Sequence, residues 1–246
     1  MSEILIVGGT GFIGRNLVKK CLISKMRVTS LSLKKPNRAE RFSKVNYIAC
    51  NLQNLEKLKR AVKKNYDFVV NAGGNIDHNN KSKTYNSHYI GVKNLHTVLS
   101  KKKIKKFVQI GSSSEYGKTL GPVRESKLCK PQMIYGRSKL MASNFLLKKN
   151  KQEKFPITIL RFFQVYGPFQ NTNRLIPFVI TSCLQNKSFS CSEGNQLRDF
   201  LYIDDAVDAI LKSLSRKDTI GKIINIGCGK PIKVKKIIKA INSKIK

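Results

Sequence analysis

The sequence of 246 residues contains no tryptophan, and none of its apolar runs approaches the length of about 20 residues that a membrane-spanning helix needs. Met1 stands three residues before the first predicted strand, which leaves no room for a signal peptide. We therefore expect a soluble, cytoplasmic protein that does not insert into a membrane. A chain of this length can bury a sizeable core as one large domain with a small appended lobe.

Paired cysteines and metal-ligand clusters are also missing. The six cysteines show no CxxC spacing, so we interpret them as reduced thiols that act mostly as small hydrophobic side chains: Cys21, Cys50, Cys129, Cys183, Cys191 and Cys228. The three histidines show no metal-ligand spacing, and His78, beside Asp77, is predicted to be a loop residue. The sequence therefore predicts no disulfide framework and no metal site.

Acidic residues are scarce, because 14 Asp and Glu stand against 48 Lys and Arg, for a formal net charge of +34. Such a field attracts polyanions, which include nucleic acids, anionic membranes and phosphorylated substrates. The lysines do not form one tract, however. The runs Lys101–Lys106 and Lys148–Lys151 fall at the predicted carboxyl ends of helices, where the helix dipole favours cations. We interpret them as a solvated basic surface, with nucleic acid as the less favoured partner.

The most informative segment that is present lies near the amino terminus. An apolar strand, Ile4–Val7, runs directly into three glycines spaced as GxxGxxG, and a helical pattern and a second strand, Val28–Leu33, follow. Such a turn brings its backbone close to a pyrophosphate at a helix amino terminus, so a dinucleotide is the first candidate ligand. A glycine-rich turn without a ligand is the alternative. The predicted cofactor-binding residues here are Gly8, Gly11, Phe12, Ile13 and Gly14.

Short apolar strands alternate with helical patterns along the whole chain. The further predicted strands are Tyr47–Ala49, Phe68–Asn71, Phe107–Ile110, Ile157–Arg161 and Ile223–Ile226. This alternation predicts an α/β fold, a Rossmann-like doubly wound parallel sheet with helices on both faces. We expect a dinucleotide-binding domain over residues 1–166. Residues 167–246 are predicted to form a small substrate lobe, together with a strand and a helix that return to the first domain.

Two further patterns carry chemistry. Tyr135 and Lys139 stand four residues apart at the start of a predicted helix, so their side chains share one face. A nearby cation lowers the pKa of a phenol, which suits Tyr135 to exchange a proton with a sugar hydroxyl or ketone. A serine run that begins with Ser112 follows the strand Phe107–Ile110 and can hydrogen-bond the same oxygen. The alternative is a serine-rich turn and a surface tyrosine.

Three later motifs complete a resemblance: LRFFQVYGP at 160–168, RDFLYIDD at 198–205 and INIGCG at 224–229. With the glycine turn, they make the chain resemble an extended short-chain dehydrogenase/reductase of the NAD(P)-dependent epimerase/dehydratase family, which acts on nucleotide sugars. The resemblance implies that Tyr135 is the catalytic acid/base and that Lys139 binds the nicotinamide ribose and tunes Tyr135. Both residues are therefore also expected among the cofactor-binding residues. It also implies that Ser112 is the hydroxyl partner, with Ser113 as the fallback.

The resemblance also implies a cofactor site, with departures from the family pattern. Where members that bind NAD end the second strand with an acid, this chain has Ser32, followed by Lys34, Lys35 and Arg38. Cations without a carboxylate suit a 2'-phosphate, so we expect NADP, with NAD as the alternative. In the family, two residues lie beside the adenine, and they correspond here to Asn51 and Leu52. A loop of small residues that approaches the cofactor corresponds here to Ala72, Gly73 and Gly74.

A second departure from the family pattern limits the type of reaction that we expect. Sugar 4,6-dehydratases of the family carry Asp-Glu after the catalytic hydroxyl, whereas this chain has Ser113 and Ser114. C4 epimerisation or 4-keto reduction therefore remains, and NADP favours a reductase. The segment Val70–His78, together with GSSSEYG at 111–117, also resembles the CDP-3,6-dideoxyhexose synthases, which reduce a 4-ketosugar. The rival hypothesis is a non-catalytic dinucleotide-binding protein of the same fold that binds RNA through its basic surface.

The substrate side is less regular. Arg198 is expected to pair with a substrate phosphate, although a surface pair with Asp199 is the alternative. Gln164 replaces the asparagine that usually holds the substrate diphosphate, and His88 replaces an asparagine that braces a helix. Ser113, Gln164 and Arg198 are the predicted substrate-binding residues, while Asp204 and Asp205 are predicted to be an N-cap and a first-turn acid. The sequence ends one helix after the last motif, so we expect the sugar pocket to be either incomplete or completed by a second subunit. The expected assembly is a homodimer.

Overall fold

The computed structural model describes residues 1–75, 79–119 and 121–245. Its centre is a sheet of seven parallel strands in the order β10-β6-β5-β4-β1-β2-β3. The strands are β1 (Glu3–Val7), β2 (Arg27–Ser32), β3 (Val45–Ala49), β4 (Phe68–Asn71), β5 (Lys106–Ser112), β6 (Ile157–Phe162) and β10 (Ile223–Ile226). The predicted Rossmann-like doubly wound sheet is confirmed, and the strand order reverses between β1 and β4, where such sheets bind ligands.

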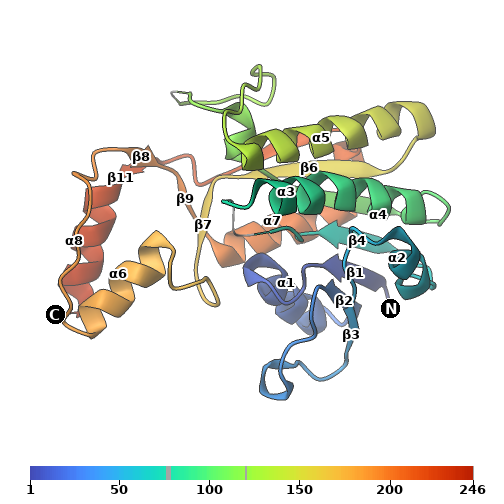
Figure 1. Ribbon diagram of the computed structural model, residues 1–246, viewed down its shortest axis with the longest axis horizontal. Coiled ribbons are helices and arrows are strands. Elements are labelled where there is room, and N and C mark those ends of the chain that lie inside the picture. Colours follow the sequence, from blue (N-terminus) through green and yellow to red (C-terminus); the bar gives the residue numbers. More distant parts are fainter. Residues whose placement is uncertain (76–78, 120, 246) are drawn as a thin grey trace.

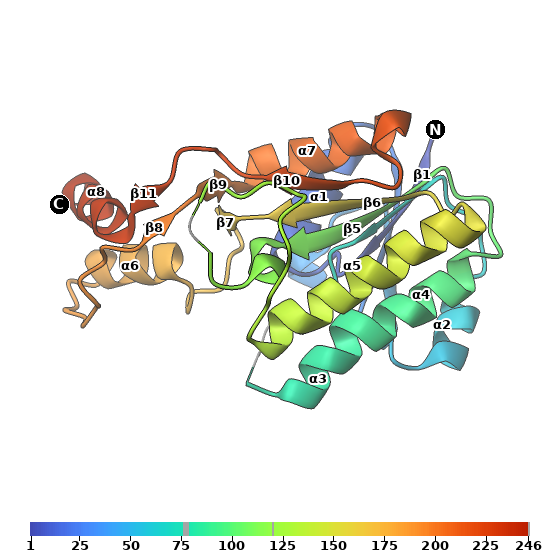
Figure 2. The ribbon, with the colours of Figure 1, turned by 90° about the horizontal axis from the view of Figure 1, so that it is seen from above.

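Helices cover both faces of the sheet (Figure 2). One face carries α1 (Phe12–Ile23) and α7 (Ile203–Ser215), and the other carries α2 (Leu55–Ala61), α4 (Gly91–Leu99) and α5 (Ile134–Glu153). The strands explain this arrangement, because their side chains alternate between the faces. In β1, Ile4 and Ile6 pack in the core beneath α1 and α7, whereas Leu5 and Val7 pack beneath α4 and α5.

The lobe stands beyond the carboxyl end of β6 (Figure 1). It consists of α6 (Leu175–Leu184) and α8 (Val234–Ile245), which pack against each other, and of β8 (Leu197–Arg198), which pairs with β11 (Ile232–Lys233). Two further short strands, β7 (Gln164–Tyr166) and β9 (Phe200–Tyr202), pair in parallel and connect the lobe to the sheet. The carboxyl edge of the sheet, where the motifs of the sequence lie, therefore faces the lobe.

The short elements complete the chain. A single turn, α3 (Lys81–Tyr85), continues through a π-helical turn, Asn86–Ile90, into α4. Three 3-10 turns are formed by Arg38–Glu40, Ser113–Tyr116 and Lys217–Thr219. Ile76, Asp77 and His78 lie outside the described residues, and with them the expected loop position of His78 and the end of the segment Val70–His78.

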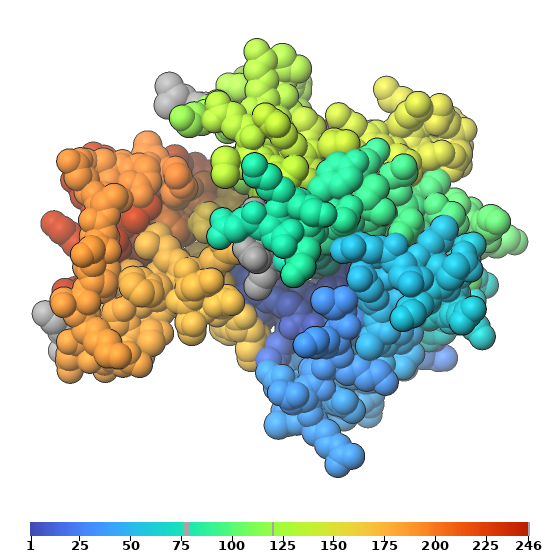
Figure 3. Space-filling view, in the orientation of Figure 1, coloured from blue at the N-terminus to red at the C-terminus, as the bar shows by residue number. Residues whose placement is uncertain are grey.

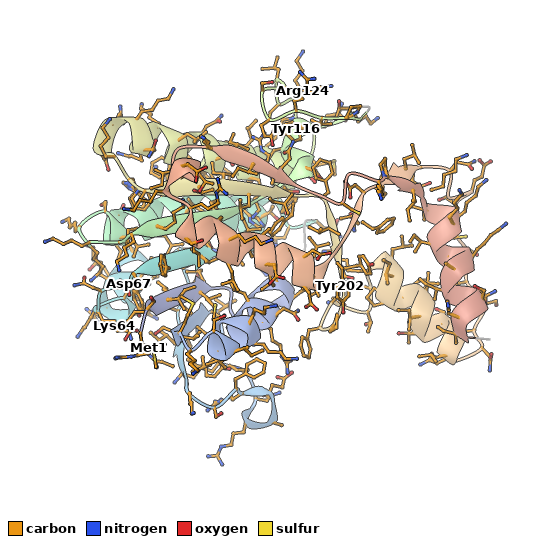
Figure 4. All side chains as sticks on the ribbon, turned by 180° about the vertical axis from the view of Figure 1, so that it is seen from behind. Met1, Lys64, Asp67, Tyr116, Arg124 and Tyr202 are labelled. Carbon is orange, nitrogen blue, oxygen red and sulfur yellow. The ribbon has the colours of Figure 1, made fainter. Side chains whose placement is uncertain are left out.

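The two ends of the sheet differ in character (Figure 4). At the amino edge, near Met1, the carboxylate of Glu3 pairs with Lys64 at 2.7 Å and that of Asp67 pairs with Lys105 at 2.9 Å. Tyr202 marks the opposite end, where the lobe begins. Among the described residues, no helix is long and apolar enough to cross a membrane.

Two local expectations from the sequence are wrong. Lys106 does not end a helix but begins β5, where it is 2% exposed, and its Nζ donates to the carbonyl oxygen of Arg216 and to Oγ1 of Thr219. Asp204 is not an N-cap, because Tyr202 occupies that position and α7 begins at Ile203. Both Asp204 and Asp205 lie in the first turn of α7, where the helix dipole favours acids.

Candidate active site

The glycine turn is packed too tightly for any other residue. Gly8 has a φ of +77°, and a Cβ there would lie 2.7 Å from Cα of Gly73. A Cβ on Gly14 would lie 2.1 Å from the carbonyl oxygen of Gly8. The turn leads into α1, whose N-cap, Gly11, has no side chain to satisfy the amide groups of Phe12 and Ile13 in the first turn. A negatively charged group is therefore favoured at this end of α1.

The loop after β4 lies beside this turn. The amide nitrogen of Ala72 donates to the carbonyl oxygen of Val7 at 3.0 Å, and that of Gly73 donates to Oδ1 of Asn71 at 3.1 Å. Gly74 packs directly beside the ring of His88, whose Nε2 lies 3.0 Å from the carbonyl oxygen of Asn75. The histidine that replaces the usual asparagine thus still ties this loop to the helix behind it.

A pocket of about 330 Å³ lies next to the glycine turn and continues past the end of β2. Its lining residues are Gly9, Thr10, Arg15, Leu33, Lys34, Lys35, Pro36, Glu40, Phe42 and Tyr47. Of the four residues expected at the cofactor's 2' position, Lys34 and Lys35 line this pocket, whereas Ser32 and Arg38 do not. Ser32 is buried behind it and accepts the amide of Thr10 at 3.2 Å, and Arg38 is exposed and outside the lining.

Sequence reasoning missed two charged residues of this pocket, Arg15 and Glu40. Nη1 of Arg15 lies 3.3 Å from Oε1 of Glu40. The place of Arg15 directly after the glycine pattern could have indicated its position, whereas nothing local marks Glu40. Asn51 and Leu52 follow β3 at the same edge, where Oδ1 of Asn51 accepts the amide of Gln53 at 3.0 Å.

The three predicted catalytic residues are brought together. Ser112 is the last residue of β5, and Tyr135 is the second residue of α5. The two side chains face each other, and the hydroxyl of Ser112 acts on the pKa of Tyr135 as a hydrogen-bonding neighbour. Lys139 lies one helical turn after Tyr135, and its buried Nζ donates to the carbonyl oxygen of Ile110 at 2.8 Å and lies 5.9 Å from the centre of the Tyr135 ring. Ser113, the fallback, lies in the 3-10 turn that follows β5.

The electrostatics of this group differ from our expectation. Burial raises the pKa of Tyr135, and the opposing effects of the Ser112 hydrogen bond and of the Arg174 cation are smaller. Burial also lowers the pKa of Lys139 to about 8, against the attraction of Glu115. The expectation that Lys139 lowers the pKa of Tyr135 is therefore wrong. Desolvation of the phenol dominates, and the cation that acts on it is Arg174, just before α6.

A buried carboxylate that the sequence did not single out holds the end of β5. Glu115 is fully buried, and its Oε1 accepts the amide of Ser112 at 2.8 Å. Its Oε2 accepts the hydroxyl of Ser143 at 2.8 Å and both Nε and Nη2 of Arg161 at 2.9 Å. One carboxylate thus joins β5, α5 and β6 beneath the Ser112 and Tyr135 hydroxyl groups.

A second pocket, of about 350 Å³, lies between the sheet edge and the lobe. It is lined by Gln164, Leu175, Cys191, Ser192, Gln196, Arg198, Phe200, Val234 and Ile238, so two of the three predicted substrate residues lie in it. The alternative Arg198–Asp199 pair is not formed. The carboxylate of Asp199 instead accepts the amides of Cys228 at 2.7 Å and Gly229 at 2.9 Å, and Nη1 of Arg198 donates to the carbonyl oxygen of Leu197.

Comparison with known proteins agrees with this arrangement. The model of the NAD dependent epimerase/dehydratase family matches residues 4–227. The chain is 30% identical to an uncharacterised UDP-glucose epimerase, YtcB, of Bacillus subtilis, over 97% of this chain and 81% of the relative. It is also 30% identical to the human dTDP-D-glucose 4,6-dehydratase, over 99% of this chain and 74% of the relative.

Solved structures show the same likeness. The structure of UDP-glucuronic acid 4-epimerase from Bacillus cereus, in complex with UDP-glucuronic acid and NAD, superimposes with a TM-score of 0.86 at 28% identity. The match covers 98% of this chain and 82% of that one. The fold is therefore shared with this epimerase structure over almost the whole chain.

Proposed function

Because the chain belongs to the NAD-dependent epimerase/dehydratase family, we propose that it transfers a hydride between a nicotinamide cofactor and C4 of a nucleotide sugar. The reaction would be 4-keto reduction or C4 epimerisation. The observation that supports this proposal most strongly is that Ser112 and Tyr135 are neighbours, with the buried Lys139 beside them, at the carboxyl edge of the sheet. A dinucleotide bound at Gly8–Gly14 would lie along the same edge.

In this mechanism, the residues of the glycine turn and Lys139 would hold a nicotinamide cofactor, which would supply or accept the hydride at C4. Tyr135 passes the accompanying proton to or from the sugar oxygen, while Ser112 donates a hydrogen bond to that oxygen. Lys139, with a pKa of about 8, would hold the nicotinamide ribose and can itself exchange a proton near neutral pH. Lys139 is thus suited to replace the proton that Tyr135 gives up.

Two features favour reduction over the other reactions. Burial raises the pKa of Tyr135, so the phenol is protonated at neutral pH and suited to donate a proton, as the reduction of a ketone requires. Ser113 and Ser114 stand where dehydration needs an acid and a base, so dehydration is disfavoured even though dehydratases are among the relatives.

The cofactor of this chain is proposed to be NADP, with NAD as the alternative. The pocket past β2 holds Lys34 and Lys35, and Ser32 stands where a carboxylate would repel a 2'-phosphate. The related Bacillus cereus structure contains NAD, which keeps that alternative open. On the substrate side, Gln164 and Arg198 are proposed to bind the diphosphate. We further propose a homodimer in the cytoplasm.

The test is turnover. Purified protein is incubated with NADPH or NADH and a panel of nucleotide 4-ketosugars, and oxidation of the nicotinamide is followed by its absorbance. The same protein is incubated with UDP-glucose to detect epimerisation. The rival hypothesis, RNA binding by the basic surface, predicts no turnover and an affinity for RNA that falls steeply with salt and survives Tyr135→Phe.

A further inference from the structure

The pair of Arg15 and Glu40 stands inside the proposed cofactor pocket and has no role in the mechanism above. Arg15 belongs to the first turns of α1, and Glu40 ends the 3-10 turn in the segment between β2 and β3, which projects from the molecule in blue (Figure 3). Their contact is single, at 3.3 Å between Nη1 and Oε1, and the side chain of Glu40 is 48% exposed. Exposed single contacts of this kind contribute little stability and are easily exchanged.

Arg15 is held in place independently of Glu40. Its guanidinium lies over the ring of Phe169, with 4.1 Å between the guanidinium carbon and the ring centre. The loop that carries Phe169 is tied to α1, because Nδ2 of Asn16 donates to the carbonyl oxygen of Pro168 at 3.0 Å. Nε of Arg15 is buried and, among the described residues, has no hydrogen-bond partner. Arg15 is thus a cation of fixed orientation, and its Nε can still donate a hydrogen bond.

The charges around the pocket are unbalanced. Arg15, Lys34 and Lys35 line it with a single carboxylate, Glu40, which leaves a formal charge of +2 from three cations and one anion. The hydroxyl of Ser32, at the end of β2, already accepts the amide of Thr10. Glu40 is therefore the one carboxylate in this lining that can either accept ribose hydroxyl groups or oppose a phosphate.

We propose that Glu40 and the 2'-phosphate of NADP compete for Arg15, so that Glu40 limits the preference of this enzyme for NADP over NAD. This inference rests on the proposed function. A phosphate offers several oxygens to a guanidinium and binds it more strongly than one half-exposed carboxylate oxygen does, so NADP displaces Glu40. With NAD, Glu40 stays on Arg15. A carboxylate that can leave Arg15 allows both cofactors to bind.

The experiment measures the dissociation constants of NADPH and NADH by fluorescence titration, for the wild type and three variants. Glu40→Gln removes the competitor and should tighten NADPH about three- to tenfold, while NADH changes less than about twofold. Arg15→Met keeps the stacking on Phe169 but removes the charge, and should weaken NADPH at least about tenfold. The matched control is Glu56→Gln, an equal charge change on α2 and outside the pocket, which should alter neither value.

The outcomes separate the inference from the proposed function. If neither NADPH nor NADH binds the wild type, the proposed function fails. If both bind, and Glu40→Gln leaves their ratio unchanged or moves it no more than Glu56→Gln does, the function stands and the competition is refuted. A shift in the ratio for Glu40→Gln, together with the opposite shift for Arg15→Met in a protein whose thermal unfolding is unchanged, supports it.

Discussion

The backbone amide of Ser112 donates to Oε1 of Glu115 at 2.8 Å, while Oγ of Ser112 accepts the amide of Ser114 at 3.1 Å. These two bonds form a capping box at the end of β5. They fix both the backbone and the hydroxyl of Ser112, which is a neighbour of Tyr135 and acts on its pKa. The proposed catalytic hydroxyl is thus positioned by a carboxylate that does not reach the pockets.

Removal of this carboxylate should destabilise the whole protein. Glu115→Ala would leave the guanidinium of Arg161, which is 1% exposed, buried without its anion, so we expect a loss of about 3–5 kcal/mol in the free energy of unfolding. Urea denaturation measures the change. Ser143→Ala removes one neutral donor from the same oxygen and should cost only about 1–2 kcal/mol. Equal losses in the two variants would contradict the central role of the Glu115–Arg161 pair.

The proposed proton transfer predicts a specific kinetic defect. Tyr135→Phe keeps the ring but removes the proton donor, so kcat should fall by a factor of about 100 to 10,000. The dissociation constant of NADPH should stay nearly unchanged, because most of the proposed contacts to the dinucleotide lie at the glycine turn and in the pocket past β2. Ser112→Ala should give a smaller fall in kcat. Full activity of Tyr135→Phe with the substrate identified by turnover would refute the role of this residue.

These residues show what the sequence can and cannot predict. The proximity of Ser112, Tyr135 and Lys139 could be predicted because local spacing places them at the end of one strand and on one face of one helix. Glu115 was missed because its significance comes from Arg161, 46 residues later. The pKa of Tyr135 was misjudged because spacing shows the neighbouring cation, whereas burial by other elements decides the shift.

The charged residues repeat this lesson. Lys106 belongs to a basic run, and only the fold shows that the carbonyl oxygen of Arg216, 110 residues away, accepts its ammonium in a buried position. Glu40 likewise becomes a pocket residue only through Arg15. The seven strands were predicted because hydrophobic runs and turn residues are local, whereas the pairing of β10 with β6, on either side of the lobe, is seen only in the structure.

The lowered pKa of Lys139 predicts a pH dependence of stability. Its pKa falls from 10.5 to about 8 on folding, so between these values the unfolded state binds more protons, and stability rises with pH. The cost of keeping Lys139 charged is fully present below about pH 8 and is removed above the unfolded pKa. It amounts to about 3 kcal/mol, at 1.36 kcal/mol per unit of pKa.

Lys139→Met removes this ionisation. We therefore expect the difference in unfolding free energy, wild type minus variant, to rise by about 3 kcal/mol between pH 7.5 and 10.5. The contributions of the other ionisable groups cancel in this difference. Guanidinium denaturation at several pH values measures the difference, and Lys148→Met, on the same helix, is the control. Parallel curves for the wild type and Lys139→Met would show that Lys139 does not titrate in this range.

His96 in α4 predicts a second effect of pH on stability, at acidic pH. Its ring packs edge-on against Phe145 and Phe155, and burial lowers its pKa even though the carboxylate of Glu153 lies 3.0 Å away. The neutral form is therefore favoured in the folded protein. This contribution is complete above the unfolded value of 6.5 and is lost as the pH falls below it. His96→Leu should flatten the acid side of the stability profile measured by thermal unfolding.

The second pocket predicts how the substrate's nucleotide end is bound. Arg198 lines it without an ion-pair partner among the described residues, because Asp199 is engaged by the amides of Cys228 and Gly229. If its guanidinium binds phosphate oxygens, Arg198→Gln should weaken the binding of UDP, CDP and dTDP equally, by about tenfold. The effect should be equal because a contact to phosphate does not depend on the base. NADPH binding should not change, since its site lies at the glycine turn. A loss confined to one nucleotide would instead place Arg198 on the base, and unchanged affinity for all three would remove it from the substrate site.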